Sequence, residues 1–157
     1  MFLTQELWTR YLQLRNHHMF LYGEDTSLID EFMKDAPVGQ TEPLRYQVTH
    51  DVYLFSCQTM DTKQSHLIQT LQDILTAPNF YSECIQLKLI VILHCNYMKP
   101  QTQHKVKSLM DASYQSGVFC FHGSKQQSLE PMIQARCLIL QVRSHSQESS
   151  VDRLCYE

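Results

Sequence analysis

The sequence predicts an α/β domain with three layers, in which a mostly parallel five-stranded sheet carries helices on both faces. Short apolar runs alternate along the chain with stretches of helical period, the pattern of a parallel sheet with crossover helices. Residues 87–93 are almost continuously apolar, as expected for a strand buried on both faces. The strand predicted at 18–22 leads through Gly23 into a helical run, so the first crossover begins with a glycine turn.

The first half of the chain is predicted to open with a helix over 4–16, because Leu7, Tyr11 and Leu14 recur on one face. Thr26 or Ser27 is expected to be the N-cap of the second helix, since a hydroxyl oxygen can accept a hydrogen bond from a free N–H of the first turn. The elements expected after the first helix are a strand at 18–22, a helix at 27–36, a loop at 37–43, and strand signals over 44–57 on both sides of His50-Asp51.

The second half is predicted to start with a helix over 62–76, because its leucines and isoleucine form one apolar stripe. Pro100 suits the first turn of a later helix, where its missing N–H costs no hydrogen bond. The elements expected after 76 are a strand at 87–93, a helix at 100–115, a strand at 118–122, a short helix at 126–135 and a strand at 138–142. We expect a single domain over 1–143, followed by a polar tail over 144–157.

The composition fits a globular domain and argues against several function classes. The 157 residues suffice to bury a core, and 43% of them are hydrophobic and 18% charged. A net charge of −3 gives no basic surplus for nucleic-acid binding by the isolated chain. No apolar run approaches the roughly 20 residues that span a bilayer, and the first residues do not have the pattern of a signal peptide. We therefore expect an intracellular protein without membrane contact.

Cysteine and histidine do not occur at the spacings of a metal site. None of the six cysteines forms a CxxC pair, and several lie in apolar runs, so we expect buried free thiols. The eight histidines include no HxxxH-type pair. A cysteine nucleophile with a histidine base, Cys95 with His94 or Cys120 with His122, is a weaker alternative. Neighbouring strand residues point to opposite faces, so Cys95 and His94 are poorly placed for it if that strand continues. Neither a metal nor another cofactor is expected.

The turn Gly23–Ser27 has the position of a phosphate-binding loop but not its residues. Such a loop has the pattern G-x-x-x-x-G-K-S/T, in which backbone N–H groups and a lysine surround the phosphates. Counted from Gly23, the second glycine, the lysine and the hydroxyl residue are replaced by Leu28, Ile29 and Asp30. The turn itself is Gly23, Glu24, Asp25, Thr26 and Ser27, which places two negative charges where phosphates would lie.

Several segments of the second half carry a family resemblance. The most specific is Glu130-Pro131 followed by Arg136-Cys137 ahead of an apolar strand, and the others are 88–92, 103–111 and 118–121. Together they resemble the AAA+ modules of DNA clamp loaders, namely the small subunits of replication factor C and the bacterial delta and delta-prime subunits. The resemblance is good over 85–143 and looser back to 18. It implies an AAA+-like fold, related to that of P-loop NTPases.

The departures of this chain from the family's pattern predict a module without ATPase chemistry. The family's acidic pair, which holds Mg²⁺ and activates water, falls on Leu93 and His94, and leucine offers no oxygen ligand. The polar residue that positions the attacking water falls near Gly123. The Gly-Glu-Asp form of the turn at Gly23 resembles bacterial delta subunits, which are not ATPases. With three parts of phosphoryl transfer missing, we expect no catalysis and no bound nucleotide.

Three groups of residues are candidates for contacts with partners. In the family, the arginine that corresponds to Arg136 reaches into the ATP site of a neighbouring subunit. The alternative for Arg136 is an ordinary salt-bridged arginine. Lys105 and Lys107 lie where clamp loaders face DNA, and the alternative is a solvated helix face. The third group is an apolar stripe on the first helix, which either docks a partner or packs on its own domain: Leu7, Trp8 and Tyr11.

The expected function is that of a non-catalytic, AAA+-like module, a pseudo-ATPase that serves as a structural or protein-binding subunit of a DNA replication or repair assembly. The alternative is an interaction scaffold that kept the fold but has no clamp-loading role. The 15 residues after Val142 are too few for the family's lid and collar, so we expect assembly through the core, the first helix or the tail. Expected partners are ATPase subunits of a clamp-loader-like complex, a polymerase or a sliding clamp, in the nucleus or at another site of DNA replication.

Overall fold

The computed structural model describes residues 2–39, 44, 46–59, 64–77 and 87–142. Its helices are α1 (Gln5–Leu14), α2 (Ser27–Met33), α3 (Gln64–Thr76), α4 (Pro100–Ala112) and α5 (Pro131–Gln134), with 3-10 turns η1 (Cys57–Thr59), η2 (Cys95–Tyr97) and η3 (Gln126–Ser128). Its strands are β1 (His18–Tyr22), β2 (Val38–Gly39), β3 (Tyr46–Thr49), β4 (Val52–Ser56), β5 (Lys88–Leu93), β6 (Gly117–Gly123) and β7 (Cys137–Gln141). None of the described helices is both long and apolar enough to cross a membrane.

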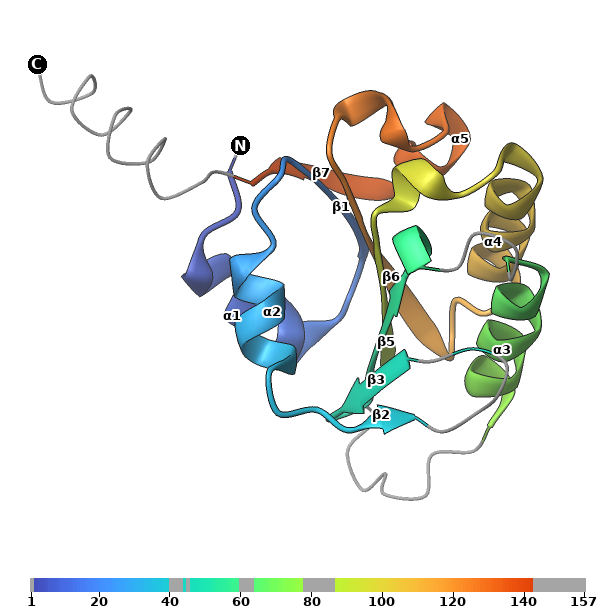
Figure 1. The fold of residues 1–157 in the computed structure, drawn as a ribbon, viewed down its shortest axis with the longest axis horizontal. Coiled ribbons are helices and arrows are strands. Elements are labelled where there is room, and N and C mark those ends of the chain that lie inside the picture. The colour runs from blue at the N-terminus through green and yellow to red at the C-terminus, as the bar shows by residue number, and fades with distance from the viewer. Residues whose placement is uncertain (1, 40–43, 45, 60–63, 78–86, 143–157) are drawn as a thin grey trace, which may run out of the picture.

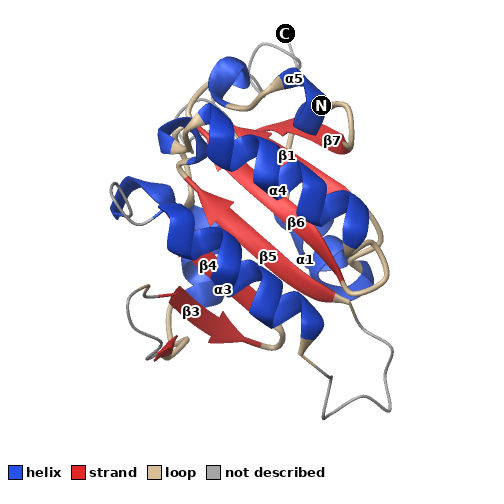
Figure 2. Ribbon diagram, turned by 90° about the vertical axis from the view of Figure 1, so that its right-hand side faces the viewer, coloured by secondary structure: helices blue, strands red, loops and turns tan. Residues whose placement is uncertain are grey.

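All the strands belong to one sheet with the order β2-β3-β4-β5-β6-β1-β7. The five strands from β4 to β7 in this order are parallel, whereas β3 pairs antiparallel with β4 and β2 antiparallel with β3. Helices α3 and α4 cover one face, and α1 and α2 cover the other (Figures 1 and 2). The predicted three-layer, mostly parallel α/β fold is therefore confirmed.

The sheet is wider than the five strands predicted from the sequence. The expected loop at 37–43 contains β2, which pairs with β3, and a strand of two residues is too short to show a sequence period. The strand signals around His50-Asp51 come from two antiparallel strands joined by a tight turn. His50 and Asp51 have φ of 49° and 58°, the left-handed backbone that two-residue hairpin turns require.

The short helix predicted over 126–135 is also divided. Leu129 has extended backbone with φ −122° and ψ 140°, so η3 ends before it. A new helix, α5, then starts at Pro131, because proline has no N–H to continue an earlier turn but fits a first turn well. The second helix is shorter than predicted as well, since α2 ends at Met33 rather than at residue 36.

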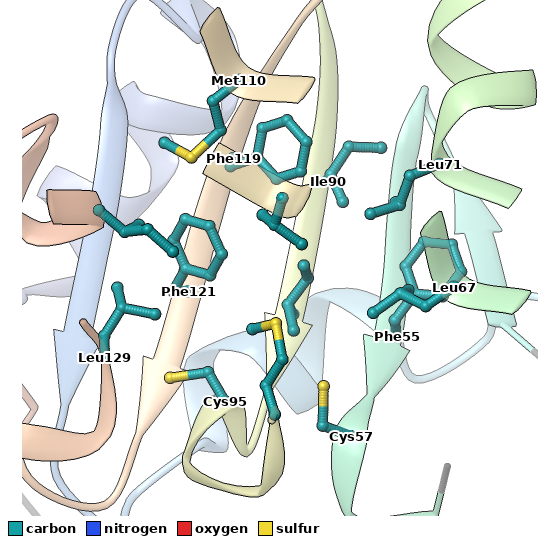
Figure 3. Close-up of a cluster of buried hydrophobic side chains, with 14 of the residues drawn as sticks. Phe55, Cys57, Leu67, Leu71, Ile90, Cys95, Met110, Phe119, Phe121 and Leu129 are labelled. Atoms are coloured by element: carbon teal, nitrogen blue, oxygen red, sulfur yellow. The ribbon is translucent and has the colours of Figure 1, made fainter. Parts of the chain in front are cut away.

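The sheet separates two apolar cores. On the side of α3 and α4, aromatic and aliphatic side chains from the strands meet the helices (Figure 3): Phe55, Ile90, Phe119 and Phe121 pack with Leu67, Leu71 and Met110. On the other side, residues of α1 and α2 pack on the alternate strand residues: Trp8, Tyr11, Ile29 and Met33 with Leu89, Val91 and Cys120. Every residue of β5 is buried, as the almost continuously apolar run predicted, and this includes the charged Lys88 at its start.

Candidate functional site

The carboxyl ends of β1, β5 and β6 meet at one edge of the sheet, the edge where open α/β folds bind ligands. The register pairs Tyr22 with Gly123 and Leu21 with His122 across β1 and β6. The chain leaves β1 through Gly23 and leaves β5 through His94. The positions singled out for nucleotide chemistry in the sequence therefore do lie together.

Gly23 is held in a conformation that needs glycine. Its φ is +138°, and a Cβ atom placed on it would come within 2.4 Å of the Val142 carbonyl oxygen. Its N–H donates to the Gly123 carbonyl oxygen at 2.9 Å, while the N–H of Val142 donates to Tyr22 at 2.8 Å. The glycine is thus explained by close backbone packing with both neighbouring strands.

After Gly23, one carboxylate of the chain accepts a hydrogen bond from an N–H at the start of α2. Asp25 Oδ1 accepts a hydrogen bond from the N–H of Ser27 at 2.8 Å. Thr26 occupies the N-cap position without a capping hydrogen bond from its side chain, and its hydroxyl donates to Asp30 Oδ2 at 2.6 Å. Glu24 is exposed. A carboxylate therefore takes up a helix N–H of the kind that a phosphate-binding loop offers to its ligand.

The positions of the acidic pair carry no oxygen ligand. Leu93 is 7% exposed and packs in the core beneath α1 and α2. His94 has left-handed backbone with φ 55°, and its ring lies at right angles to that of His122 at a centroid distance of 6.0 Å. Tyr97 contacts the ring of His94 at 6.5 Å. A hard cation such as Mg²⁺ prefers oxygen ligands, and this pair of positions provides none.

His122 belongs to this edge, which the sequence did not indicate. It is 2% exposed, and neither ring nitrogen has a hydrogen-bond partner among the described residues. Burial lowers its pKa and the neighbouring His94 lowers it further, while the backbone of Gly23 and the carboxylates of Asp30 and Asp25 act in the opposite direction. Its alternation with the core residue Phe121 would have placed it on the face of α2, but nothing in the sequence shows that it is unpaired.

The thiols are poorly suited to nucleophilic catalysis. Cys57, Cys95, Cys120 and Cys137 are all free, and the first three are buried. Burial raises the pKa of Cys57 and of Cys137 to about 12, and it raises the pKa of Cys95 and of Cys120 above the ordinary thiol value. Within the described ranges, no three side chains of His, Cys, Asp or Glu come together as a metal site would need.

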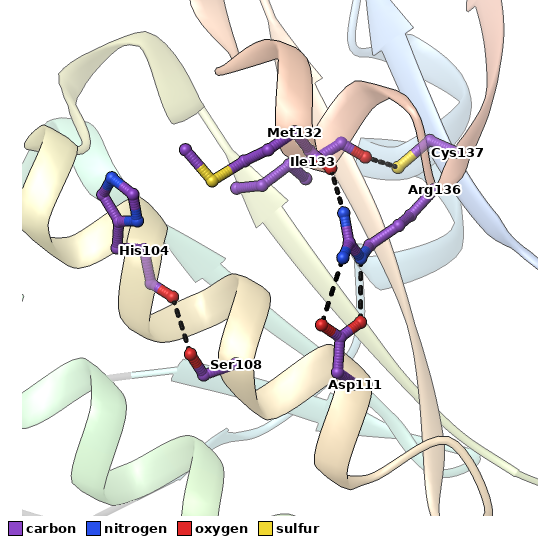
Figure 4. A network of polar contacts seen from close by, with 7 residues as sticks. All are labelled: His104, Ser108, Asp111, Met132, Ile133, Arg136 and Cys137. Atoms are coloured by element: carbon purple, nitrogen blue, oxygen red, sulfur yellow. Dashed lines mark hydrogen bonds and ion pairs between the residues drawn. The ribbon is translucent and has the colours of Figure 1, made fainter.

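Arg136 lies at the other end of the sheet. It precedes β7, whose first residue pairs with His18 at the start of β1, so about 16 Å of strand separates it from the Gly23 turn. Its Nε donates to Asp111 Oδ1 at 2.8 Å, its Nη2 to Oδ2 at 3.2 Å, and its Nη1 to the Met132 carbonyl oxygen at 2.5 Å (Figure 4). The arginine therefore forms a salt bridge within the chain. It is too far from the Gly23 turn to reach the edge where the carboxyl ends of β1, β5 and β6 meet.

The other two candidate groups lie on helices of opposite faces. On α4, Lys105 is exposed and Lys107 is half-buried, with its charge close enough to Asp111 to favour the ionised carboxylate. On α1, Trp8 and Tyr11 are each 3% exposed and pack against the sheet, whereas Leu7 is half-buried. Trp8 and Tyr11 therefore pack on the domain itself. Of the three residues in the apolar stripe, only Leu7 borders the surface.

Comparison with known proteins supports the fold. No protein-family model matches the chain, and no curated protein matches it. Among solved structures, the chain is similar to a DNA polymerase III gamma subunit-related protein from Thermotoga maritima, with a TM-score of 0.56 and 17% identity over 91% of this chain. The match spans 47% of the length of that protein. The chain thus shares the α/β fold of that DNA polymerase III gamma subunit-related protein, and at 17% identity the relationship is a distant structural one.

Proposed function

We propose that this chain is a non-catalytic, AAA+-like module that acts as a structural or protein-binding subunit of a DNA replication or repair assembly. The observation that carries the proposal is the Gly23 edge, where Asp25 binds the start of α2 and Leu93 and His94 replace an acidic pair. A domain that retains this fold without oxygen ligands for Mg²⁺ at that position is suited to binding rather than to hydrolysis. The likeness to a DNA polymerase III subunit-related protein supports the replication setting.

Loss of nucleotide binding is tested directly by calorimetric titration of the full chain with millimolar ATP, with and without Mg²⁺. We expect no saturable heat in either condition. Tight, saturable binding would overturn the pseudo-ATPase proposal, since it would require a phosphate site that the Gly23–Ser27 turn does not offer.

The partners we propose are ATPase subunits of a clamp-loader-like complex, a polymerase or a sliding clamp, within the cell at sites of replication. Affinity purification of the tagged full chain followed by mass spectrometry tests this. Recovery of replication or repair proteins supports the proposal. Recovery of unrelated proteins only would favour the alternative, an interaction scaffold without a clamp-loading role.

Arg136 is the residue we propose to act on a neighbour's nucleotide, after exchanging Asp111 for the phosphates. In a reconstituted complex, Arg136→Ala is expected to lower the partner's ATPase rate, and Arg136→Lys to restore it only in part, because lysine cannot form the bidentate contact. Asp111→Ala is the matched control, since it breaks the same salt bridge but leaves the arginine free. If the partner's ATPase rate is the same with all three variants, Arg136 does not act on the neighbour's nucleotide.

DNA contact by Lys105 and Lys107 within the complex is the remaining proposal. Lys105→Glu with Lys107→Glu is expected to weaken DNA binding by the complex and to reduce its salt dependence, since fewer counterions are released. Unchanged binding would leave the two lysines as a solvated helix face.

A further inference from the structure

The strand β7 forms an edge of the sheet without the usual protection. It pairs with β1 on one side and stands last in the strand order. Natural edge strands commonly carry charged residues or proline, which oppose pairing with another chain. The sequence of β7, Cys-Leu-Ile-Leu-Gln, has neither. Leu138 in its middle is 44% exposed.

The backbone of β7 offers hydrogen-bonding groups at this edge. Val142 N–H donates inward to Tyr22 of β1, and the Gln141 carbonyl oxygen accepts outward from the N–H of Leu3. Since the N–H and C=O of alternate residues in a parallel strand point to opposite sides, Ile139 directs both groups outward, as Gln141 does. Within the described ranges, only Phe2 forms a bridge to this edge, and it does so at Gln141.

An apolar cavity of about 140 Å³ lies between α1 and β7, beside this edge. Leu7 and Leu14 of α1 line it opposite Leu138 of β7. A cavity of about 150 Å³ in another protein holds a benzene molecule, so this one has room for a leucine or phenylalanine side chain. Leu14 is 58% exposed, so the apolar surface continues from the cavity to the outside of the domain.

The rim of the cavity favours an acidic ligand. Arg10 and His17 line it together with the apolar residues. The ion pair between Arg10 and Glu6 is long, at 3.8 Å, and both side chains are largely exposed. Such surface pairs contribute little to stability, so Arg10 can pair with an acidic ligand instead. Tyr11 also lines the cavity, and its buried hydroxyl has no partner among the described residues.

From these features we infer that the edge of β7 binds an extended segment of a partner protein as an added strand. One large apolar side chain of that segment fills the cavity, and an adjacent Asp or Glu faces Arg10 and His17. Backbone hydrogen bonds to an edge strand supply affinity, and the pocket supplies specificity. The inference rests on the proposed protein-binding role and specifies its surface and the chemistry of its partner.

The probe is the synthetic peptide acetyl-TDVLVDT-amide, added to the isotope-labelled full chain and followed by NMR. We expect the peptide to slow hydrogen exchange at the Ile139 amide and to shift the methyl signals of Leu14 and Leu138. The same peptide with N-methylated backbone should not bind, since it cannot form the ladder. Leu14→Glu should weaken binding about tenfold or more, because it places a charge beside the apolar cavity. The matched control is Tyr114→Glu, which changes a residue that is 67% exposed in the turn after α4 and should leave binding unchanged.

Four results overturn the inference: no protection of Ile139, equal binding of the N-methylated peptide, a concentration-dependent dimer that Leu14→Glu abolishes, or an Ile139 amide already protected in the peptide-free monomer. A dimer would mean that a second copy of this chain occupies the β7 edge. Protection of Ile139 in the peptide-free monomer would mean that another part of the same chain occupies it. Affinity purification separates this failure from that of the proposed function. If wild type and Leu14→Glu recover the same replication proteins, the proposed surface is wrong and the proposed function stands. If the peptide binds but no such proteins are recovered, the surface stands and the proposed function is wrong.

Discussion

Arg136 and Asp111 are joined by two hydrogen bonds, Nε to Oδ1 at 2.8 Å and Nη2 to Oδ2 at 3.2 Å, which link the start of β7 to the last turn of α4. Hydrogen bonding by Arg136 lowers the pKa of Asp111 below its ordinary value of 3.8. The pair lies at the surface, with the two side chains 33% and 50% exposed, so its contribution to stability is small and screened by salt.

The first prediction concerns the pH dependence of this pair. A lowered carboxylate pKa stabilises the folded state above the ordinary value of 3.8, and the stabilisation is lost as the pH falls through the folded pKa. Wild type should therefore unfold at slightly higher urea than Asp111→Asn at neutral pH, and the gap should close below 3.8. Urea midpoints over this range measure it, with Glu31→Gln on α2 as an exposed control. A gap that does not change with pH would contradict the ion pair.

The second prediction concerns Arg15, which is 2% exposed and ties three segments together. Its guanidinium donates to the carbonyl oxygens of His50 at 2.6 Å, Asp51 at 3.2 Å and Leu87 at 3.0 Å. These bonds connect the end of α1, the β3–β4 turn and the entry to β5. Arg15→Ala leaves these oxygens without the donor, so we expect a loss of about 3 kcal/mol in the free energy of unfolding.

Two further variants make the Arg15 measurement specific. Arg15→Lys should lose less than Arg15→Ala, because an ammonium donates hydrogen bonds but cannot span all three oxygens. Arg10→Ala, on the exposed side of the same helix, should change the free energy of unfolding by less than about 0.5 kcal/mol. Urea unfolding followed by the fluorescence of Trp8 reports all three. Equal effects of Arg15→Ala and Arg10→Ala would mean that the three-segment contact is not stabilising.

The third prediction tests whether Gly23 is kept for its shape. Alanine would adopt φ near +138° only with strain, and its Cβ would lie 2.4 Å from the Val142 carbonyl oxygen. Gly23→Ala should therefore lower the free energy of unfolding by about 1–3 kcal/mol. Glu24→Ala is the neighbouring control and should have little effect, since Glu24 is exposed. A similar, small change in both variants would show that the corner after β1 adjusts freely.

The fold was largely predictable because its signals are local and strong. The apolar run of β5 and the stripe of α3 each determine a buried face by themselves. The predicted strand at 18–22 matches β1 at both ends. The antiparallel edge was less predictable, because β2 consists of Val38 and Gly39 only and depends on its pairing with β3. The break at Leu129 likewise depends on its burial in the core.

The site was predictable in position but not in detail. The sequence placed Gly23 and His94 at strand ends, and the parallel sheet brings such ends to one edge. It did not show that Asp25 accepts a hydrogen bond from the N–H of Ser27. Nor did it show that His122 lies beside His94 without a hydrogen-bond partner among the described residues, because both features depend on side-chain packing. The pairing of Arg136 with Asp111 spans 25 residues of sequence and was invisible for the same reason.

The fourth prediction concerns His122, whose buried ring nitrogens have no partner among the described residues. An unpaired buried polar group destabilises the folded state, and an apolar side chain of similar size removes that cost. His122→Leu should therefore raise the free energy of unfolding by about 1 kcal/mol at neutral pH.

The pH dependence of stability gives a second, independent signature of His122. Because burial holds the folded pKa of His122 below 6.5, the unfolded chain binds the proton more readily, and stability falls as the pH drops below 6.5. His122→Leu should lose less stability than wild type over that range in urea titrations, whereas His104→Gln, on the exposed face of α4, should behave like wild type. An acid-induced loss identical in wild type and His122→Leu would show that the ring does have a partner, or that it stays accessible to water.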